Sequence, residues 1–176
     1  MATKSVSPAT SPRNTRKTAY AVVLVAIGVA LAPYTSFPIG IAIVNPTQHF
    51  VNVLAAVLLG PWWAVLTAMV IGILRNAMGV GTLLAFPGGM IGALLAGLLY
   101  RRFKNLYAAA GGEIVGTGIL GALVSGWLVA PYLMNKQMPM LVLLASFLGS
   151  TVLGTILGFL ALKLLERVGY VKLGKD

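Results

Sequence analysis

The densest polar cluster of the sequence is NPTQHFVN, residues 45–52, which stands directly before the apolar run VLAAVLLG. It holds the only histidine of the chain, His49, between Gln48 and Asn52, which are four residues apart and share one face of a helix. Amide and imidazole groups both donate and accept hydrogen bonds, so they suit recognition of a small polar solute. The chain has no cysteine, which excludes thiol catalysis and thiolate metal sites. It has only three acidic residues, so few side chains are available for acid–base pairs or for other metal sites.

The rest of the sequence is apolar enough for a membrane protein. Hydrophobic residues make up 59% of the chain and charged residues 9%, whereas a soluble domain carries about 25% charged residues. The apolar residues form long runs rather than alternating with polar ones, which predicts transmembrane helices. A net charge of +10 can indicate a nucleic-acid partner. Here the basic residues flank the apolar runs, so no nucleic-acid partner is predicted.

An all-α integral membrane protein with six transmembrane helices is therefore predicted, with one membrane domain over residues 18–167. The predicted helices cover residues 18–33, 49–60, 61–78, a segment that ends at RRFK (101–104), 108–133 and 140–165. The proline-bearing residues 34–47 form a loop. Residues 1–17 are predicted to be a disordered basic cytosolic tail, and residues 168–176 a C-terminal cytosolic tail.

The positions of lysine and arginine predict the orientation in the cell membrane. Of the 13 such residues, only Arg75 and Lys136 fall on the side opposite the termini. Since cytoplasmic loops are enriched in lysine and arginine, both termini are predicted to be cytoplasmic. The segment 49–60 is short for a crossing, but without it RRFK and the C-terminal tail would lie opposite the N-terminal tail.

This orientation places NPTQHFVN at the outer end of the second helix. Arg75 lies about 21 Å along the third helix, at the same depth. Alone, such an arginine either snorkels to the outer headgroups or faces protein or water. Two polar clusters at one depth predict a pocket open to the exterior and lined by Gln48, His49, Asn52, Arg75 and Asn76.

Three further residues are weaker candidates. Trp127 could stack on a ring of the solute, although an aromatic residue is also expected in the interfacial belt. Ser146 lies with Ser150 on one face of the last predicted helix, where small hydroxyl groups mostly serve packing. Glu113, the only acid inside a predicted span, either pairs with Arg102 or Lys104 near the cytoplasmic interface or carries a functional proton, and the structural pairing is the expected one.

Small residues recur four apart in several predicted helices. The pairs Gly92/Ala96, Gly112/Gly116 and Gly154/Gly158 predict close helix packing. In the first helix, Ala19, Ala26 and Ala30 lie near one face, with Val23 between them. This stripe serves either internal packing or docking of another membrane protein, and its spacing alone favours internal packing.

The blocks TQHFVNVLAAVLLGPWWAVLTAMVIGILRN and GTLLAFPGGMIGALLAGLLYRR resemble the substrate-binding S-components of energy-coupling factor (ECF) vitamin transporters, most closely the ThiW group. The resemblance covers about residues 20–165. It implies a six-helix protein that captures a vitamin precursor near the outer face, together with a transmembrane coupling subunit and two cytosolic ATPases. For the ThiW group it implies the thiazole precursor of thiamine, hydroxyethylthiazole. It also implies that the AxxxA docking motif is Ala26 and Ala30, with Ala19 extending the stripe.

Other functions stay open at this point. The solute could be hydroxymethylpyrimidine or thiamine, although thiamine is cationic and the predicted pocket presents Arg75 without an acid on the outer side. From a different class, the chain could be a structural subunit of a membrane complex. The sequence has no G-x-x-x-x-G-K-[ST] loop for ATP, and neither an enzyme nor a cofactor is predicted.

Overall fold

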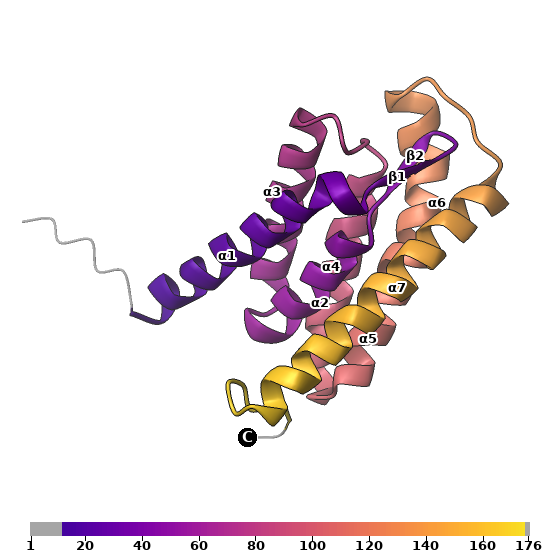
Figure 1. Cartoon of the computed structure of the whole chain (residues 1–176). Helices are drawn as coiled ribbons and strands as arrows, with labels where there is room; N and C mark the ends of the chain where they lie inside the picture. Colours follow the sequence, from indigo (N-terminus) through magenta and orange to yellow (C-terminus); the bar gives the residue numbers. More distant parts are fainter. Residues whose placement is uncertain (1–11, 175–176) are drawn as a thin grey trace, which may run out of the picture.

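The computed structural model describes residues 12–174, which are almost entirely helical (Figure 1). Five separate helices are α1 (Pro12–Thr35), α2 (Pro46–Leu58), α3 (Pro61–Ala77), α4 (Ala85–Phe103) and α7 (Met140–Arg167). Between α4 and α7 a continuous helical rod runs from Leu106 to Leu133. Its α-helical parts alternate with π-helical parts, in the order α5 (Leu106–Glu113), η1 (Ile114–Gly121), α6 (Ala122–Val124) and η2 (Ser125–Leu133).

Counting the rod as one helix, all six predicted helices are present, and most of their boundaries agree within a few residues. In the described part of the chain, three helices are long and apolar enough to cross a membrane: Asn14–Thr35, Leu106–Leu133 and Met140–Arg167. The helix α2 has 13 residues and α3 has 17, fewer than the about 20 that a crossing needs. The helical fold is confirmed, whereas the six crossings stay a prediction.

Two regions differ from the predicted boundaries. The helix α1 begins at Pro12, so residues 12–17 of the predicted tail are helical, while residues 1–11 lie outside the described part. The predicted loop 34–47 contains an antiparallel hairpin of β1 (Phe37–Ile39) and β2 (Ala42–Val44). Gly40 turns the hairpin with a φ of 59°, a left-handed conformation that glycine adopts more readily than other residues. Strands of three residues are too short for an alternating pattern to reveal them.

Small residues bring α4 against the helical rod. A Cβ atom at Gly112 would lie 2.8 Å from Cα of Ala96, and one at Gly116 would lie 2.6 Å from Cα of Gly92. The two predicted small-residue motifs therefore face each other across one helix contact. Without a hydrophobic driving force in lipid, such close approach of backbones supplies much of the packing energy.

The third predicted motif joins α7 to α2. A Cβ atom at Gly154 would lie 2.8 Å from Cβ of His49, and one at Gly158 would lie 3.0 Å from the carbonyl oxygen of Phe50. Both glycines are thus needed for the backbones to approach. The short helix α2 consequently sits inside the bundle, with most of its residues buried.

The helix α1 lies at the edge of the bundle and packs on α2 and α3 with one face only (Figure 1). That face is formed by Ala21, Leu24, Gly28 and Ala32, which are buried. The stripe of Ala19, Val23, Ala26 and Ala30 is exposed. Internal packing of this stripe, which its spacing favoured, is therefore wrong. The helix carries small residues on two faces, so spacing alone could not decide which one packs.

The bundle has two chemically different ends (Figure 1). The turns α2–α3 and α4–α5 and the end of α7 lie together at one end, where Lys17, Arg101 and Lys104 line one shallow cavity. The hairpin, the loop 78–84 and the loop 134–139 lie at the opposite end. Folding therefore brings together basic residues that are far apart in the sequence, such as Lys17 and Arg101.

We expect Gly112→Ala to destabilise the protein, because a methyl group there meets the backbone of α4 and overpacking typically costs about 1–3 kcal/mol. The adjacent Gly111 is the matched control, because its Cβ would meet nothing within 4 Å. Gly111→Ala should be neutral or stabilising, since alanine is the better helix former. Melting temperatures of the detergent-solubilised variants measure the difference. Equal melting temperatures would mean that the contact between α4 and the rod tolerates a side chain.

Candidate solute-binding site

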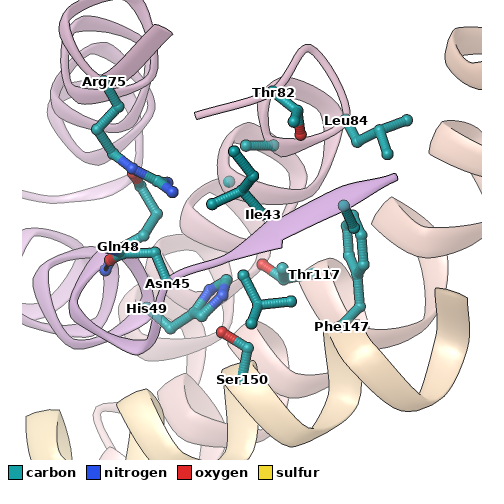
Figure 2. A pocket seen from close by; sticks show the side chains of 14 residues that line it. Ile43, Asn45, Gln48, His49, Arg75, Thr82, Leu84, Thr117, Phe147 and Ser150 are labelled. Atoms are coloured by element: carbon teal, nitrogen blue, oxygen red, sulfur yellow. Dashed lines mark hydrogen bonds between the residues drawn. The ribbon is translucent and has the colours of Figure 1, made fainter. Parts of the chain in front are cut away.

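A cavity lies beside the strand β2 of the hairpin, and Figure 2 shows the side chains that line it. It contains about 370 Å³ of empty space, counted with its open mouth. Its walls come from β2, α2, α3, α4, η1 and α7 together with the loop before α4. The apolar lining includes Ile43, Leu84 and Phe147, and the polar lining consists of Asn45, Gln48, His49, Arg75, Thr82, Thr117 and Ser150.

The first turn of α2 explains why NPTQHFVN is so polar. Asn45 is the N-cap of α2, and its Oδ1 accepts a hydrogen bond of 2.8 Å from the backbone N–H of Gln48. The Nδ2 of Asn45 donates to Thr35 Oγ1 at 3.0 Å and to Ser36 Oγ at 2.7 Å, which ties α2 to the end of α1. Pro46 occupies the first helical turn, where its missing N–H costs nothing. The start of α2 is thereby held in place at the cavity wall.

Arg75 reaches the cavity from α3 and is only 1% exposed. Its Nη1 donates to Gln48 Oε1 at 3.4 Å, and its Nη2 donates to Ser36 Oγ at 3.4 Å and to the carbonyl oxygen of Val80 at 3.2 Å. All of these partners are neutral. The alternative that Arg75 only anchors α3 at the headgroups is therefore wrong, because the guanidinium group points into the protein.

A chain of hydrogen bonds continues from Gln48 toward the rod. Gln48 Nε2 donates to Asn52 Oδ1 at 3.3 Å. Asn52, which is fully buried behind the cavity wall, donates from Nδ2 to the carbonyl oxygen of Gly89 at 3.0 Å and to Glu113 Oε1 at 2.9 Å. The predicted residue Asn52 thus supports the cavity without lining it.

Glu113 pairs with His49, and the predicted pairing with Arg102 or Lys104 is wrong. His49 Nδ1 lies 3.0 Å from Glu113 Oε1, and the carboxyl group is fully buried. Both basic residues at the end of α4 are exposed. The prediction chose basic residues close to Glu113 in the sequence. The observed partner, His49, is brought to Glu113 by the packing of the rod against α2. The signal available in the sequence was that the chain has a single histidine and a single acid inside the predicted helices.

The structure places three other candidates outside the cavity. Asn76 donates to the carbonyl oxygen of Gly72 at 2.8 Å, which ties it to its own helix. Ser146 likewise donates to the carbonyl oxygen of Val142 at 2.7 Å. Trp127 is 65% exposed on the outer surface of η2, where it fits the aromatic belt better than a ring-stacking role.

Several polar atoms of the cavity lining have no hydrogen-bond partner. They are Arg75 Nε, Thr82 Oγ1 and Ser150 Oγ, all of which are buried. A buried polar atom without a partner costs about 1–3 kcal/mol. Unpartnered buried hydroxyl groups also occur away from the cavity, at Thr67, Thr151 and Thr155, so the polar lining as a whole, and not these atoms alone, suits a polar ligand. Among the described residues, no group of three acidic or histidine side chains could hold a metal ion.

We expect Asn45→Ala to destabilise the fold more than Asn105→Ala, although both residues cap a helix. Asn105 caps α5 with a single exposed hydrogen bond to the N–H of Tyr107, and losing a cap costs about 1 kcal/mol. Asn45 also holds Thr35 and Ser36, so its loss should cost clearly more. Thermal unfolding in one detergent compares the two variants. Equal losses would mean that the contacts of Asn45 to the end of α1 contribute nothing to stability.

Comparison with known proteins identifies the family to which the chain belongs. No curated protein sequence matches the chain significantly. The family model for ThiW, described as thiamine-precursor transporter protein, matches residues 18–168. That range runs from α1 to the end of α7 and contains the cavity with all of its polar lining. The match covers most of the 176 residues, and the chain therefore belongs to the ThiW family of thiamine-precursor transporter proteins.

Proposed function

We propose that this protein is the substrate-capture S-component of an ECF-type transporter and that its solute is hydroxyethylthiazole. Membership of a thiamine-precursor transporter family supports transport of a precursor. The observation that carries the proposal is a cavity that combines apolar walls with a largely buried polar lining. Hydroxyethylthiazole matches it because one small apolar ring carries a nitrogen acceptor and a hydroxyl group. Pockets of this kind combine apolar walls with a few convergent polar groups.

The cavity faces the exterior in this proposal. All lysines and arginines except Arg75 and Lys136 belong to the end of the bundle that carries the termini or to the terminal segments themselves. Because positive residues favour the cytoplasmic side, that end is assigned to the cytoplasm. Six crossings of the cell membrane then place both termini inside and the hairpin over the outer mouth of the cavity.

The energy for uptake comes from partner subunits. The sequence contains no phosphate-binding loop, so the proposal includes a transmembrane coupling subunit and two ATPases. The exposed stripe of Ala19, Ala26 and Ala30 supports α1 as the docking helix, because small side chains let another helix approach closely in lipid.

Thiamine and hydroxymethylpyrimidine are the alternatives to hydroxyethylthiazole as the solute. The sequence argued against cationic thiamine because no acid was expected near Arg75, yet Glu113 belongs to the same hydrogen-bond network. Charge therefore does not exclude thiamine. Hydroxymethylpyrimidine and thiamine are therefore the comparison ligands for any titration. A purely structural subunit would have no need for a cavity with a buried polar lining.

We expect Gln48→Ala and His49→Ala to weaken binding of hydroxyethylthiazole at least fivefold, because each removes about 1 kcal/mol of hydrogen bonding. Arg75→Lys should weaken it similarly, since an ammonium group lacks the fixed fork of guanidinium. Ser146→Ala is the matched control, because its hydroxyl group bonds its own helix outside the cavity. Isothermal titration of each folded variant gives the dissociation constants. Unchanged affinity in all three cavity variants would move the binding site elsewhere.

We expect Ala26→Leu with Ala30→Leu to abolish uptake while leaving binding of the solute intact. Both alanines are exposed on α1, away from the cavity, so larger side chains should disturb only the contact with the coupling subunit. Uptake of labelled solute is measured in cells that co-express the coupling subunit and both ATPases. Accumulation by this chain alone, without ATPases, would contradict the proposed energy coupling.

A further inference from the structure

We propose that His49 recognises a donor group of the solute, such as a hydroxyl, through an unprotonated Nε2, and that Glu113 is the positioning residue that fixes this state. The proposal rests on the proposed function, because it assigns the same cavity to a solute with an O–H or N–H group. Glu113 itself does not line the cavity. Its effect on the solute therefore passes through the lining residues that it contacts, His49 and Thr117.

The carboxyl group of Glu113 makes all of its hydrogen bonds to described residues through Oε1, which acts as the acceptor, while Oε2 is buried without a partner. Its Oε1 lies 3.0 Å from His49 Nδ1, 2.9 Å from Asn52 Nδ2 and 2.9 Å from Thr117 Oγ1. The amide of Asn52 can only donate at Nδ2, and a carboxylate oxygen accepts several hydrogen bonds at once. The hydroxyl group of Thr117 also lies 2.8 Å from the carbonyl oxygen of Gly88 and shares its single proton between the two acceptors. Because Oε1 is the acceptor, the hydrogen bond between His49 and Glu113 must be donated by a proton on His49 Nδ1.

The charge of the buried network supports a neutral imidazole. Arg75 supplies one positive charge and Glu113 one negative charge, and Gln48 and Asn52 connect them by hydrogen bonds. With a neutral His49 the network carries no net charge. A second proton on the ring would leave an unbalanced positive charge among groups that are almost fully buried, which is costly in a medium of low dielectric constant. Neutral His49 with its proton on Nδ1 leaves a lone pair on Nε2.

The free nitrogen faces the cavity. His49 lines the cavity, and Figure 2 shows its ring directed into the space beside Thr117 and Ser150. Among the described residues none forms a hydrogen bond with Nε2, since the only contact of the ring is the one to Glu113. A lone pair at this position can accept a hydrogen bond from a donor group of the solute. It cannot form a hydrogen bond with a group that is itself only an acceptor.

The two sides of the cavity therefore have opposite hydrogen-bonding character. Arg75 lines the cavity and carries only donors, and His49 offers an acceptor. A thiazole ring nitrogen without hydrogen can bind only the donor, whereas an aliphatic hydroxyl group can bind the acceptor. A solute with one of each is thereby held in one orientation.

The state of the ring is tested directly, because His49 is the only histidine. Labelling the whole chain with ¹⁵N-histidine gives the nitrogen signals of a single residue, and NMR distinguishes the two tautomers and the imidazolium ion. We expect a proton on Nδ1 and none on Nε2 in the wild-type protein without solute. A proton on Nε2 would overturn the proposal, and this result needs no variant and no ligand.

The effect on recognition is tested with two ligands, hydroxyethylthiazole and 5-ethyl-4-methylthiazole, which lacks the hydroxyl group. We expect the wild-type protein to prefer the alcohol at least about tenfold, because loss of the donor leaves a buried acceptor unpaired. Glu113→Gln removes the charge at nearly constant size, so the preference should fall at least threefold. Glu166→Gln is the matched control, because it makes the same change in an exposed ion pair with Lys163.

The possible results separate this proposal from the proposed function. Equal binding of both thiazoles by the wild-type protein would overturn the role of His49 and leave transport of a thiazole intact. Binding of neither would overturn hydroxyethylthiazole as the solute, while the ¹⁵N spectrum still decides the state of His49. If Glu113→Gln fails to fold, the wild-type preference and the wild-type spectrum decide the proposal without it.

Discussion

The buried contact between His49 and Glu113 is the interaction on which the arrangement of this bundle depends. Both groups are largely taken out of water, and leaving a buried polar group without its hydrogen-bond partner costs about 1–3 kcal/mol. Every further polar group of α2 must then also find a partner. The chain from Arg75 through Gln48 and Asn52 to Glu113 satisfies that requirement and connects α3, α2 and the rod. The polar network therefore specifies how these helices are rotated and how deep they lie.

Close helix packing makes that network possible. Glycine faces small residues where the rod crosses α4, and glycines of α7 admit the backbone of α2. Larger residues at either contact would move Glu113 or His49 by more than a hydrogen bond tolerates. One carboxylate oxygen of Glu113 lies against the backbone of Gly92, where an added Cβ would come within 2.7 Å of Oε2. Packing and polar pairing are thus one constraint in this protein.

Binding and docking are assigned to different elements. The cavity is built by α2, α3, α4, α7, η1 and the hairpin, whereas α1 contributes an exposed stripe of small residues on its outer face. A change on that stripe leaves the cavity lining untouched, since no residue of α1 lines the cavity. This separation lets one capture protein present its solute at one end while its outer helix contacts a partner, as the proposed function requires.

The sequence by itself determined the six helices, the polar character of the α2 start and the small-residue contacts, because each depends on local composition and helical periodicity. It also brought Gln48, His49 and Arg75 to one depth, since rise per residue fixes depth once the helix ends are known. Only the tertiary structure decided that Glu113 pairs with His49, that Ser150 and Thr82 line the cavity, and that Trp127 does not. Those outcomes depend on the rotation of each helix about its axis and on which helices become neighbours. Contacts between residues distant in the sequence determine the rotation of each helix and the choice of its neighbours. The periodicity within one helix contains no information about these contacts.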